Sequence, residues 1–440
     1  MRRVLSVLLV IALLVPALAF AGDTGLTAAP RAIVELLYNG EYQQVFDQST
    51  ADVQDALGTA DGLRAIWAQI EQVYGTFEAI GDVSAVEQGG LTVGQVTCSH
   101  ATADITYTVA LTPAGLLCGL TVSGVAQKAA ASTADTSKFV TEAITLRAGE
   151  ADETQGMLTL PVGEGPFPAV IMMQGSGASD MNETAYGISI FRDIAEGLAI
   201  AGVASIRYDK YTYVHADLLQ NDYTVKEEYL IDAADALALL QADDRIGDVY
   251  LLGHSLGGML VPRVMQTLGA DYFAGGIILA GSPLALWEIQ YHQNLALLPS
   301  LSEADQATAQ ATIDANLAML SKMPVMTDEE LQNSLFFGIS AWYQMDLMSV
   351  DTAQTAIALQ KPLFIAQGSK DWQVVPEDGI EAWQTALDDQ LTANYHLYPN
   401  MNHMLCDQEG EPAYNTSDYQ AGSTVSEILI TDIAAWVLNQ

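Results

Sequence analysis

A serine nucleophile is predicted by the segment Gly253-His-Ser-Leu-Gly257. An apolar run, 249–252, precedes the segment, and residues 259–268 after it have helical character. A sharp turn between a strand and a helix lifts a serine hydroxyl, here that of Ser255, above the edge of a sheet. Glycine at 253 and 257 leaves room for so tight a bend. The motif alone also occurs by chance as an incidental turn, but the flanking strand and helix favour a catalytic serine.

A serine hydroxyl reacts only when a neighbouring imidazole can take its proton. Of the six histidines, we predict that His403 is this base, because it follows a strand in a loop that can reach over the sheet edge. His396 lies within that strand, where its side chain would point into a sheet face. His215 and His292 are interpreted as surface or pocket-lining residues.

The imidazole in turn needs a carboxylate that fixes its tautomer and stabilises its charged form. The buried-type strand 362–367 ends in a glycine turn followed by Asp371, which we predict to be this carboxylate. The alternative is an ordinary aspartate of a surface loop. The chain order of Ser255, Asp371 and His403 is the order of nucleophile, acid and base that α/β-hydrolases use.

Two backbone N–H groups could hold the negative oxygen of a tetrahedral intermediate. Strand 169–174 ends in a Gly-Ser-Gly turn, and we predict that the N–H groups of Ser176 and Leu256 form this oxyanion hole. Gln174 and Gly175, at the same turn, are predicted to bind substrate. As a phosphate cradle the turn is weak, because no third glycine or P-loop lysine follows it.

A substrate pocket is predicted beneath residues 286–357, an insertion rich in methionine and aromatic residues. Such insertions can form a helical cap over an active site, and flexible methionines and flat aromatic rings suit an apolar acyl or alcohol group. We therefore predict that Trp342 and Tyr343 bind substrate. The alternative is that these side chains simply form the core of the cap.

From residue 138 onward, strands alternate with helices, which predicts a mostly parallel sheet covered on both faces. The expected strands are 141–148, 153–161, 169–174, 204–209, 249–253, 276–280, 362–367 and 392–398. The expected helices are 188–201, 225–240, 259–268, 379–387 and 425–438. Eight strands with the serine turn after the fifth predict an α/β-hydrolase fold over 138–440.

The N-terminal part of the chain reads differently. Residues 1–21 combine a basic start, an apolar stretch and small residues before Ala21, which predicts a secretory signal peptide and a secreted or cell-envelope protein. An uncleaved membrane anchor is the alternative. Residues 22–125 are expected to form a small α+β domain with helices at 31–48 and 62–74 and three later strands, and 126–137 is a small-residue linker.

Composition limits the partners of the protein. The 54 acidic and 16 basic residues give a net charge of −38, which argues against a nucleic-acid partner because phosphate neutralisation needs clustered Lys and Arg. No segment after the N-terminal stretch is long and apolar enough to predict stable membrane insertion. The three cysteines are too few for a disulfide framework, and metal-ligand spacings such as Cys-x-x-Cys are missing, so we expect no metal site.

The predicted triad and the Gln-Gly-Ser-Gly turn resemble those of the serine α/β-hydrolases over 138–440. The runs 175–180, 191–198 and 207–210 resemble a group of bacterial esterases and serine-aminopeptidase-like hydrolases that carry a small N-terminal domain. The helices and meander of 22–125 resemble the cone-shaped ketosteroid-isomerase-like fold. The first resemblance implies hydrolysis of carboxylic esters through an acyl-serine intermediate, with no cofactor.

Two alternatives stay open. A serine peptidase or an acyltransferase would use the same residues, because the triad does not fix the leaving group or the acceptor. A non-catalytic envelope binding protein that retains the hydrolase scaffold is the more distant alternative. The N-terminal domain could gate the pocket or bind a polymer or a partner.

Overall fold

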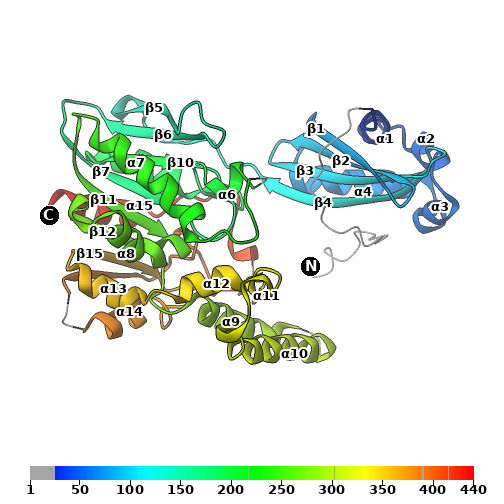
Figure 1. Cartoon of the computed structure of the whole chain (residues 1–440). Helices are drawn as coiled ribbons and strands as arrows, with labels where there is room; N and C mark the ends of the chain where they lie inside the picture. Colours follow the sequence, from blue (N-terminus) through cyan, green and yellow to red (C-terminus); the bar gives the residue numbers. More distant parts are fainter. Residues whose placement is uncertain (1–24, 217, 302, 389–390, 415) are drawn as a thin grey trace. The chain divides into compact units, whose positions relative to one another are not determined.

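The computed structural model describes residues 25–440 except 217, 302, 389, 390 and 415 (Figure 1). The predicted signal peptide, 1–21, lies outside the described residues. The chain divides into two compact units, the first with residues 25–129 and 185–187 and the second with residues 130–184 and 188–440. Each unit has a sheet of its own.

The first unit is an α+β unit in which helices precede a four-stranded antiparallel meander. Its elements are α1 (Ala28–Tyr38), α2 (Tyr42–Asp47), α3 (Ala51–Leu57), α4 (Ala60–Tyr74), β1 (Phe77–Gln88), β2 (Leu91–His100), β3 (Ala103–Leu111) and β4 (Leu117–Gln127). Apolar residues of α1 and α4, among them Leu37 and Trp67, pack on inward-facing residues of the sheet such as Val96 and Tyr107. This packing buries the apolar side of the helices against one face of the sheet.

Two expectations for this unit need correction. The helix expected over 31–48 is two helices, because the chain turns at Gly40, which has a φ of +78° that favours glycine. The sequence predicted three strands and the structure has four, since β1 was missed. Two register irregularities within β1 disrupt the alternation of apolar and polar residues by which a strand is recognised.

The second unit is built on an eight-stranded sheet in the order β16-β15-β12-β11-β7-β10-β6-β5. The strands are β5 (Phe139–Leu146), β6 (Thr154–Pro161), β7 (Phe167–Met173), β10 (Ala204–Tyr208), β11 (Ile246–His254), β12 (Gly275–Leu279), β15 (Leu363–Gly368) and β16 (Ala393–Tyr398). Along this order, neighbouring strands from β16 to β10 pair parallel. β6 pairs antiparallel with both β10 and β5. The predicted fold class, an α/β-hydrolase fold preceded by a small α+β domain, is confirmed.

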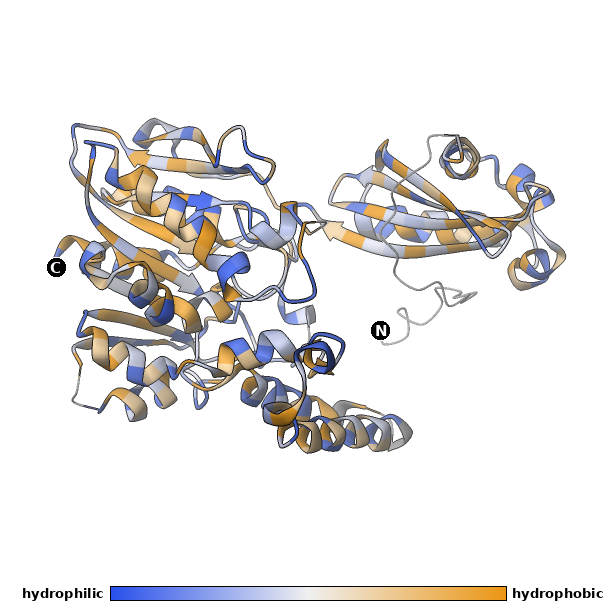
Figure 2. Cartoon of the chain, viewed as in Figure 1, coloured by the Kyte–Doolittle hydropathy of each residue, from blue (hydrophilic) through white to orange (hydrophobic). Residues whose placement is uncertain are grey.

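Helices cover both faces of this sheet (Figure 1). One face carries α7 (Ile231–Gln241), α8 (Leu256–Leu268), α13 (Thr352–Leu359) and α14 (Ile380–Leu387), which share one core. The other face carries α15 (Glu427–Leu438), against which α5 (Ile190–Ala201) packs. The central strands are mostly apolar along their length, as Figure 2 shows. Parallel strands buried on both faces require such continuous apolar runs.

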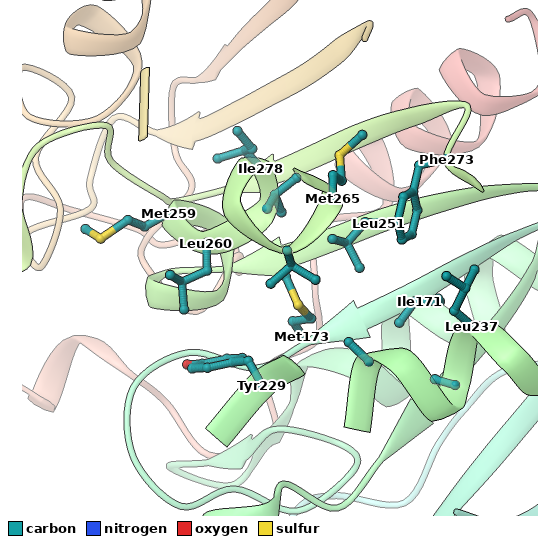
Figure 3. Close-up of a cluster of buried hydrophobic side chains, with 14 of the residues drawn as sticks. Ile171, Met173, Tyr229, Leu237, Leu251, Met259, Leu260, Met265, Phe273 and Ile278 are labelled. Atoms are coloured by element: carbon teal, nitrogen blue, oxygen red, sulfur yellow. The ribbon is translucent and has the colours of Figure 1, made fainter. Parts of the chain in front are cut away.

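The core under α7 and α8 holds the start of α8, and therefore the serine turn, against the sheet (Figure 3). Met173 of β7, Leu251 of β11 and Ile278 of β12 meet Leu260 and Met265 of α8, and all five side chains are buried. Full burial of an aliphatic side chain of this size contributes about 1.5–3 kcal/mol. The strand end that precedes Ser255 is thus held in place by a packed core.

Between β12 and β15 the chain forms a helical insertion. Its elements are α9 (Leu286–Leu297), α10 (Glu303–Leu320), α11 (Asp328–Gln332), β13 (Leu335–Phe336), β14 (Ile339–Ser340) and α12 (Ala341–Met348). It has a small core of its own around Met323, Leu331 and Phe336. Helix α13, the last element of the expected 286–357 insertion, instead belongs to the main core, to which it contributes Ala353 and Ala356.

The remaining strands and α-helices are short: β8 (Thr184–Ala185), β9 (Ile188–Ser189) and α6 (Tyr211–Val214). Among the described residues, no helix has the length and apolar character needed to cross a membrane. Cys98, Cys118 and Cys406 are free thiols. Burial raises the pKa of Cys98 and of Cys406 to about 12, so neither is a ready nucleophile at neutral pH.

Candidate active site

Ser255 lies in a strained turn between β11 and α8. Its φ is +54° and its ψ is −119°, a backbone conformation that residues other than glycine rarely adopt. The surroundings leave little choice, because a Cβ on Gly253 would overlap the carbonyl group of Gly257. A Cβ on Gly257 would lie 2.5 Å from the carbonyl oxygen of Gln174. The two glycines of the motif are therefore required by close backbone approach, as the sequence predicted.

The structure brings Ser255, His403 and Asp371 together. The Ser255 hydroxyl lies 3.1 Å from Nε2 of His403, and Nδ1 of His403 lies 2.8 Å from Oδ2 of Asp371. In the arrangement these contacts allow, the hydroxyl donates to Nε2 while Nδ1–H donates to the carboxylate. His403 is 4% exposed and Asp371 is 2% exposed. The imidazole can accept a proton from the serine while the carboxylate stabilises the charged ring.

Four donors fix the Asp371 carboxylate. Its Oδ1 accepts the backbone N–H groups of Gln373 and Val374, each at 2.9 Å. Its Oδ2 accepts the amide of Gln367 at 2.7 Å in addition to the His403 ring. Gln367 belongs to β15 and was missed by sequence reasoning, although its position as a polar residue at the end of a buried strand was a usable signal.

The turn that follows β7 lies beside the serine. A Cβ on Gly175 would lie 3.1 Å from the Cβ of Ser255, so the backbone of this turn approaches the nucleophile closely. Ser176 is exposed and Leu256 is buried at the start of α8. Within the described residues, neither of their backbone N–H groups donates to a protein acceptor. The oxyanion hole that these two groups would form stays a prediction.

A buried lysine anchors this turn. Nζ of Lys210 donates to the carbonyl oxygens of Gly175 at 2.7 Å and Gly177 at 3.0 Å, and to the hydroxyl of Tyr229 at 2.8 Å. Its charge is matched by Glu228, whose Oε1 lies 2.5 Å away. Glu228 and Tyr229 sit on a π-helical turn, Lys226–Leu230, of a kind common at functional sites. Burial lowers the pKa of Lys210, although Glu228 opposes this shift.

The residue before the nucleophile is also engaged. Nδ1 of His254 lies 3.0 Å from Oε1 of Glu183, and its Nε2 lies 2.9 Å from the carbonyl oxygen of His403. The same Oε1 accepts the backbone N–H of Gly175 at 2.5 Å. Sequence reasoning treated His254 only as the variable position of the motif, and it assigned no role to Glu183.

The other predicted substrate-binding residues take part in packing. Gln174 is 1% exposed and donates through its amide to the carbonyl oxygen of Tyr208 at 2.5 Å. Tyr343 is 2% exposed within the main core. The indole N–H of Trp342 donates to the carbonyl oxygen of Asp222 at 2.8 Å. These contacts are those expected of residues that hold the turn and the insertion in place.

The histidines that were not predicted to be the catalytic base form contacts away from Ser255. His292 pairs with Asp378 at 2.8 Å, and His396 lies 3.8 Å from Asp432. His215 contacts the carbonyl oxygen of Glu153 at 3.0 Å. In the described part of the chain, no group of three His, Cys, Asp or Glu side chains could hold a metal ion.

The sequence pattern of the serine aminopeptidase S33 family, a hydrolase family, matches residues 185–411, which are more than half of the 440 residues. This chain belongs to the serine aminopeptidase S33 family. The matched range contains Ser255, Asp371 and His403. Residues 31–120 match a second family, which is described only as a protein of unknown function (DUF3887).

The proteins that this chain is similar to include esterases and a peptidase. The chain is 32% identical over 284 residues to esterase EstD from Thermotoga maritima, a match that covers 64% of this chain and 65% of EstD. Among solved structures it is similar to Est1E from Butyrivibrio proteoclasticus, at 17% identity and a TM-score of 0.43. It is also similar to proline iminopeptidase from Mycobacterium smegmatis, at 16% identity and a TM-score of 0.45. Each match covers 68% of this chain and 98% of the other. The family match and the sheet topology together make the chain a hydrolase with the α/β-hydrolase fold.

Proposed function

We propose that this protein hydrolyses carboxylic esters through an acyl-serine intermediate. The observation that carries the proposal is the pair of contacts at 3.1 Å and 2.8 Å that links Ser255, His403 and Asp371. The similarity to esterase EstD supports an ester as substrate. Since the chain spans only about two thirds of EstD, the activity of the whole relative is transferred here as a proposal.

In the first half of the proposed reaction, Nε2 of His403 takes the hydroxyl proton while Oγ of Ser255 bonds to the ester carbonyl carbon. The C=O π electrons move onto oxygen, and the N–H groups of Ser176 and Leu256 donate to that oxyanion. Collapse of the intermediate breaks the bond to the alcohol, which leaves with the proton from His403. The acyl group remains on Ser255.

In the second half, water occupies the place of the alcohol. His403 takes a proton from water as the hydroxide oxygen bonds to the acyl carbon, and the same N–H groups hold the second oxyanion. The acyl–Oγ bond then breaks and His403 returns the proton to Ser255. The balance is ester plus water giving acid plus alcohol, and no cofactor is consumed.

We also propose that the reaction takes place outside the cytoplasm. The basis is the sequence of residues 1–21, with a basic start, an apolar stretch and small residues before Ala21. Fractionation of an expressing host followed by N-terminal sequencing tests this proposal. Recovery outside the cytoplasm of a chain that begins at Gly22 supports it, and recovery of the chain in the cytoplasm contradicts it.

The test of the reaction compares the wild type with Ser255→Ala and His403→Ala on p-nitrophenyl esters of increasing acyl length. Loss of Ser255 should reduce kcat by roughly 10⁶-fold. Ser369→Ala is a matched control, because Ser369 lies in an exposed loop where its hydroxyl donates to the carbonyl oxygen of Pro399. Ester turnover by Ser255→Ala at a rate near that of the wild type would exclude the proposal.

Because the chain belongs to the serine aminopeptidase S33 family, the most important alternative to an esterase is an aminopeptidase. Amino-acid p-nitroanilides at the same concentrations separate the two chemistries, since both would use Ser255. Esters are intrinsically more reactive than anilides. An esterase is supported if kcat/KM on esters exceeds kcat/KM on anilides by more than this intrinsic difference. Preference for one free α-amino anilide over every ester would replace the proposed substrate class.

A further inference from the structure

The side chain of His254 has an acceptor at each ring nitrogen. Nε2 faces the carbonyl oxygen of His403 at 2.9 Å, and a carbonyl oxygen can only accept. Nδ1 faces Oε1 of Glu183 at 3.0 Å. That oxygen also accepts the N–H of Gly175, so it acts as an acceptor. With an acceptor opposite each ring nitrogen, both nitrogens carry a proton, which makes the ring an imidazolium.

The environment supports this charge state. His254 is 3% exposed and Glu183 is 7% exposed, and an unpaired charge at that depth would be strongly destabilising. Burial opposes the charged ring, but attraction and hydrogen bonding to Glu183 outweigh burial and raise the pKa of His254. Asp371 also favours the charged form, and the other titratable ring in contact is that of His403, whose centroid is 4.9 Å away.

The position of this pair links three parts of the site. His254 is covalently next to Ser255 and donates to the peptide of His403. Glu183 holds both the ring of His254 and the peptide of Gly175, the residue before Ser176. The nucleophile, the base and the oxyanion turn are thereby connected through one ion pair.

We propose that His254 is a protonated positioning residue, which together with Glu183 fixes the His403 backbone and the Gly175 turn relative to Ser255. The effect on rate rests on the proposed function, whereas the charge state of the ring does not. Neither residue touches the reacting atoms. Their loss should therefore lower kcat through misalignment and leave KM nearly unchanged.

Two substitutions separate the contacts. In His254→Gln, only the amide nitrogen can donate a hydrogen bond, whereas Glu183 and the His403 carbonyl oxygen both need a donor. One of these two contacts must therefore be lost. In Glu183→Gln, the amide oxygen can still accept from Gly175 and from Nδ1–H of a neutral ring. The unprotonated Nε2 would then face the His403 carbonyl oxygen without a proton between them.

We expect each variant to lose roughly 10- to 100-fold in kcat, the scale of a small misplacement in an active site, with KM within about threefold. The loss in Glu183→Gln should be smaller at low pH, where the ring can regain its second proton. His396→Gln is the control, because His396 lies on β16, 3.8 Å from Asp432 and outside the site. An unchanged kcat in both variants would overturn the proposed role.

The charge state is read directly by NMR of the full chain labelled with ¹⁵N-histidine. Two-bond ¹H–¹⁵N spectra should show one ring, absent in His254→Gln, with both nitrogens protonated at pH 7. If that variant does not fold, the signal that changes in Glu183→Gln gives the assignment. A ring at this position with one unprotonated nitrogen at pH 7 would refute the inference. The spectrum does not require esterase activity, so its failure is distinct from failure of the proposed function.

Discussion

Oγ of Ser255 and Nε2 of His403 lie 3.1 Å apart, although 148 positions separate the two residues in the chain. Ser255 follows β11 and His403 follows β16, and the intervening strands β12 and β15 are parallel to both. The carboxyl ends of parallel strands meet at one edge of the sheet, where open α/β sheets bind their ligands. The strand topology therefore creates the contact, and the variants below test what each supporting residue adds.

Asp371→Asn should lower kcat by about 10⁴-fold with little change in KM. An asparagine can turn its NH₂ group toward Nδ1 of His403 and so favour the wrong tautomer of the ring. Kinetics on a p-nitrophenyl ester measures the effect. Asp378→Asn is the control, because that carboxylate binds His292 and not His403. Equal activity of Asp371→Asn and the wild type would contradict the assigned role.

Gly257→Ala should destabilise the second unit by about 1–3 kcal/mol or prevent its folding, because the new Cβ would overlap backbone carbonyl groups of Met173 and Gln174. Gly247→Ala is a matched control on β11, where a Cβ would lie 3.6 Å from Pro166 in ordinary contact. Urea denaturation of both variants measures the difference. Equal midpoints would show that the turn tolerates a side chain.

Lys210→Met should cost about 3–5 kcal/mol of stability, since it leaves the buried carboxylate of Glu228 without its partner. The double variant Lys210→Met/Glu228→Gln should recover most of this stability. It should still turn over ester at least about tenfold more slowly than the wild type, because the carbonyl oxygens of Gly175 and Gly177 have lost their cationic donor. Recovery of both stability and kcat in the double variant would limit Lys210 to a structural role.

The stabilising effect of His254 should depend on pH. Its pKa is raised in the folded chain, so the folded state keeps a proton that the unfolded chain releases near pH 6.5. The stabilisation is full below that pH and is lost as the pH rises through the folded-state pKa. The midpoint of thermal denaturation of the wild type should thus exceed that of His254→Gln by a margin that shrinks from pH 6 to pH 9. A margin that grows with pH would contradict the raised pKa.

The strands of the second unit and the residues that follow them could be predicted from the sequence, because the sequence pattern of each strand is strong and local. Buried parallel strands appear as continuous apolar runs, and each run is followed by the residue that its strand end presents: Ser255 after 249–253, Asp371 after 362–367, His403 after 392–398. β1 carried no such signal, since its register irregularities break the alternation of apolar and polar residues.

The hydrogen bonds that support the catalytic residues could not be predicted from the sequence, because they depend on how side chains are oriented in the folded chain. Glu183 bonds to His254, Lys210 bonds to the carbonyl oxygen of Gly175, and Gln367 bonds to Asp371. The positions of these three residues in the sequence do not predict any of these bonds. Trp342 and Tyr343 show the converse case. Their aromatic character suggested a pocket, but Trp342 bonds to the peptide of Asp222 and Tyr343 is buried in the core.

Covalent labelling tests the central claim most directly. The wild type, treated with a fluorophosphonate and analysed by peptide mass spectrometry, should carry the phosphonyl group on Ser255. Labelling of His403→Ala should be slower by several orders of magnitude, and Ser255→Ala should not be labelled at that peptide. Correctly folded wild-type protein that reacts no faster than His403→Ala, or that is labelled on another residue, would contradict the account.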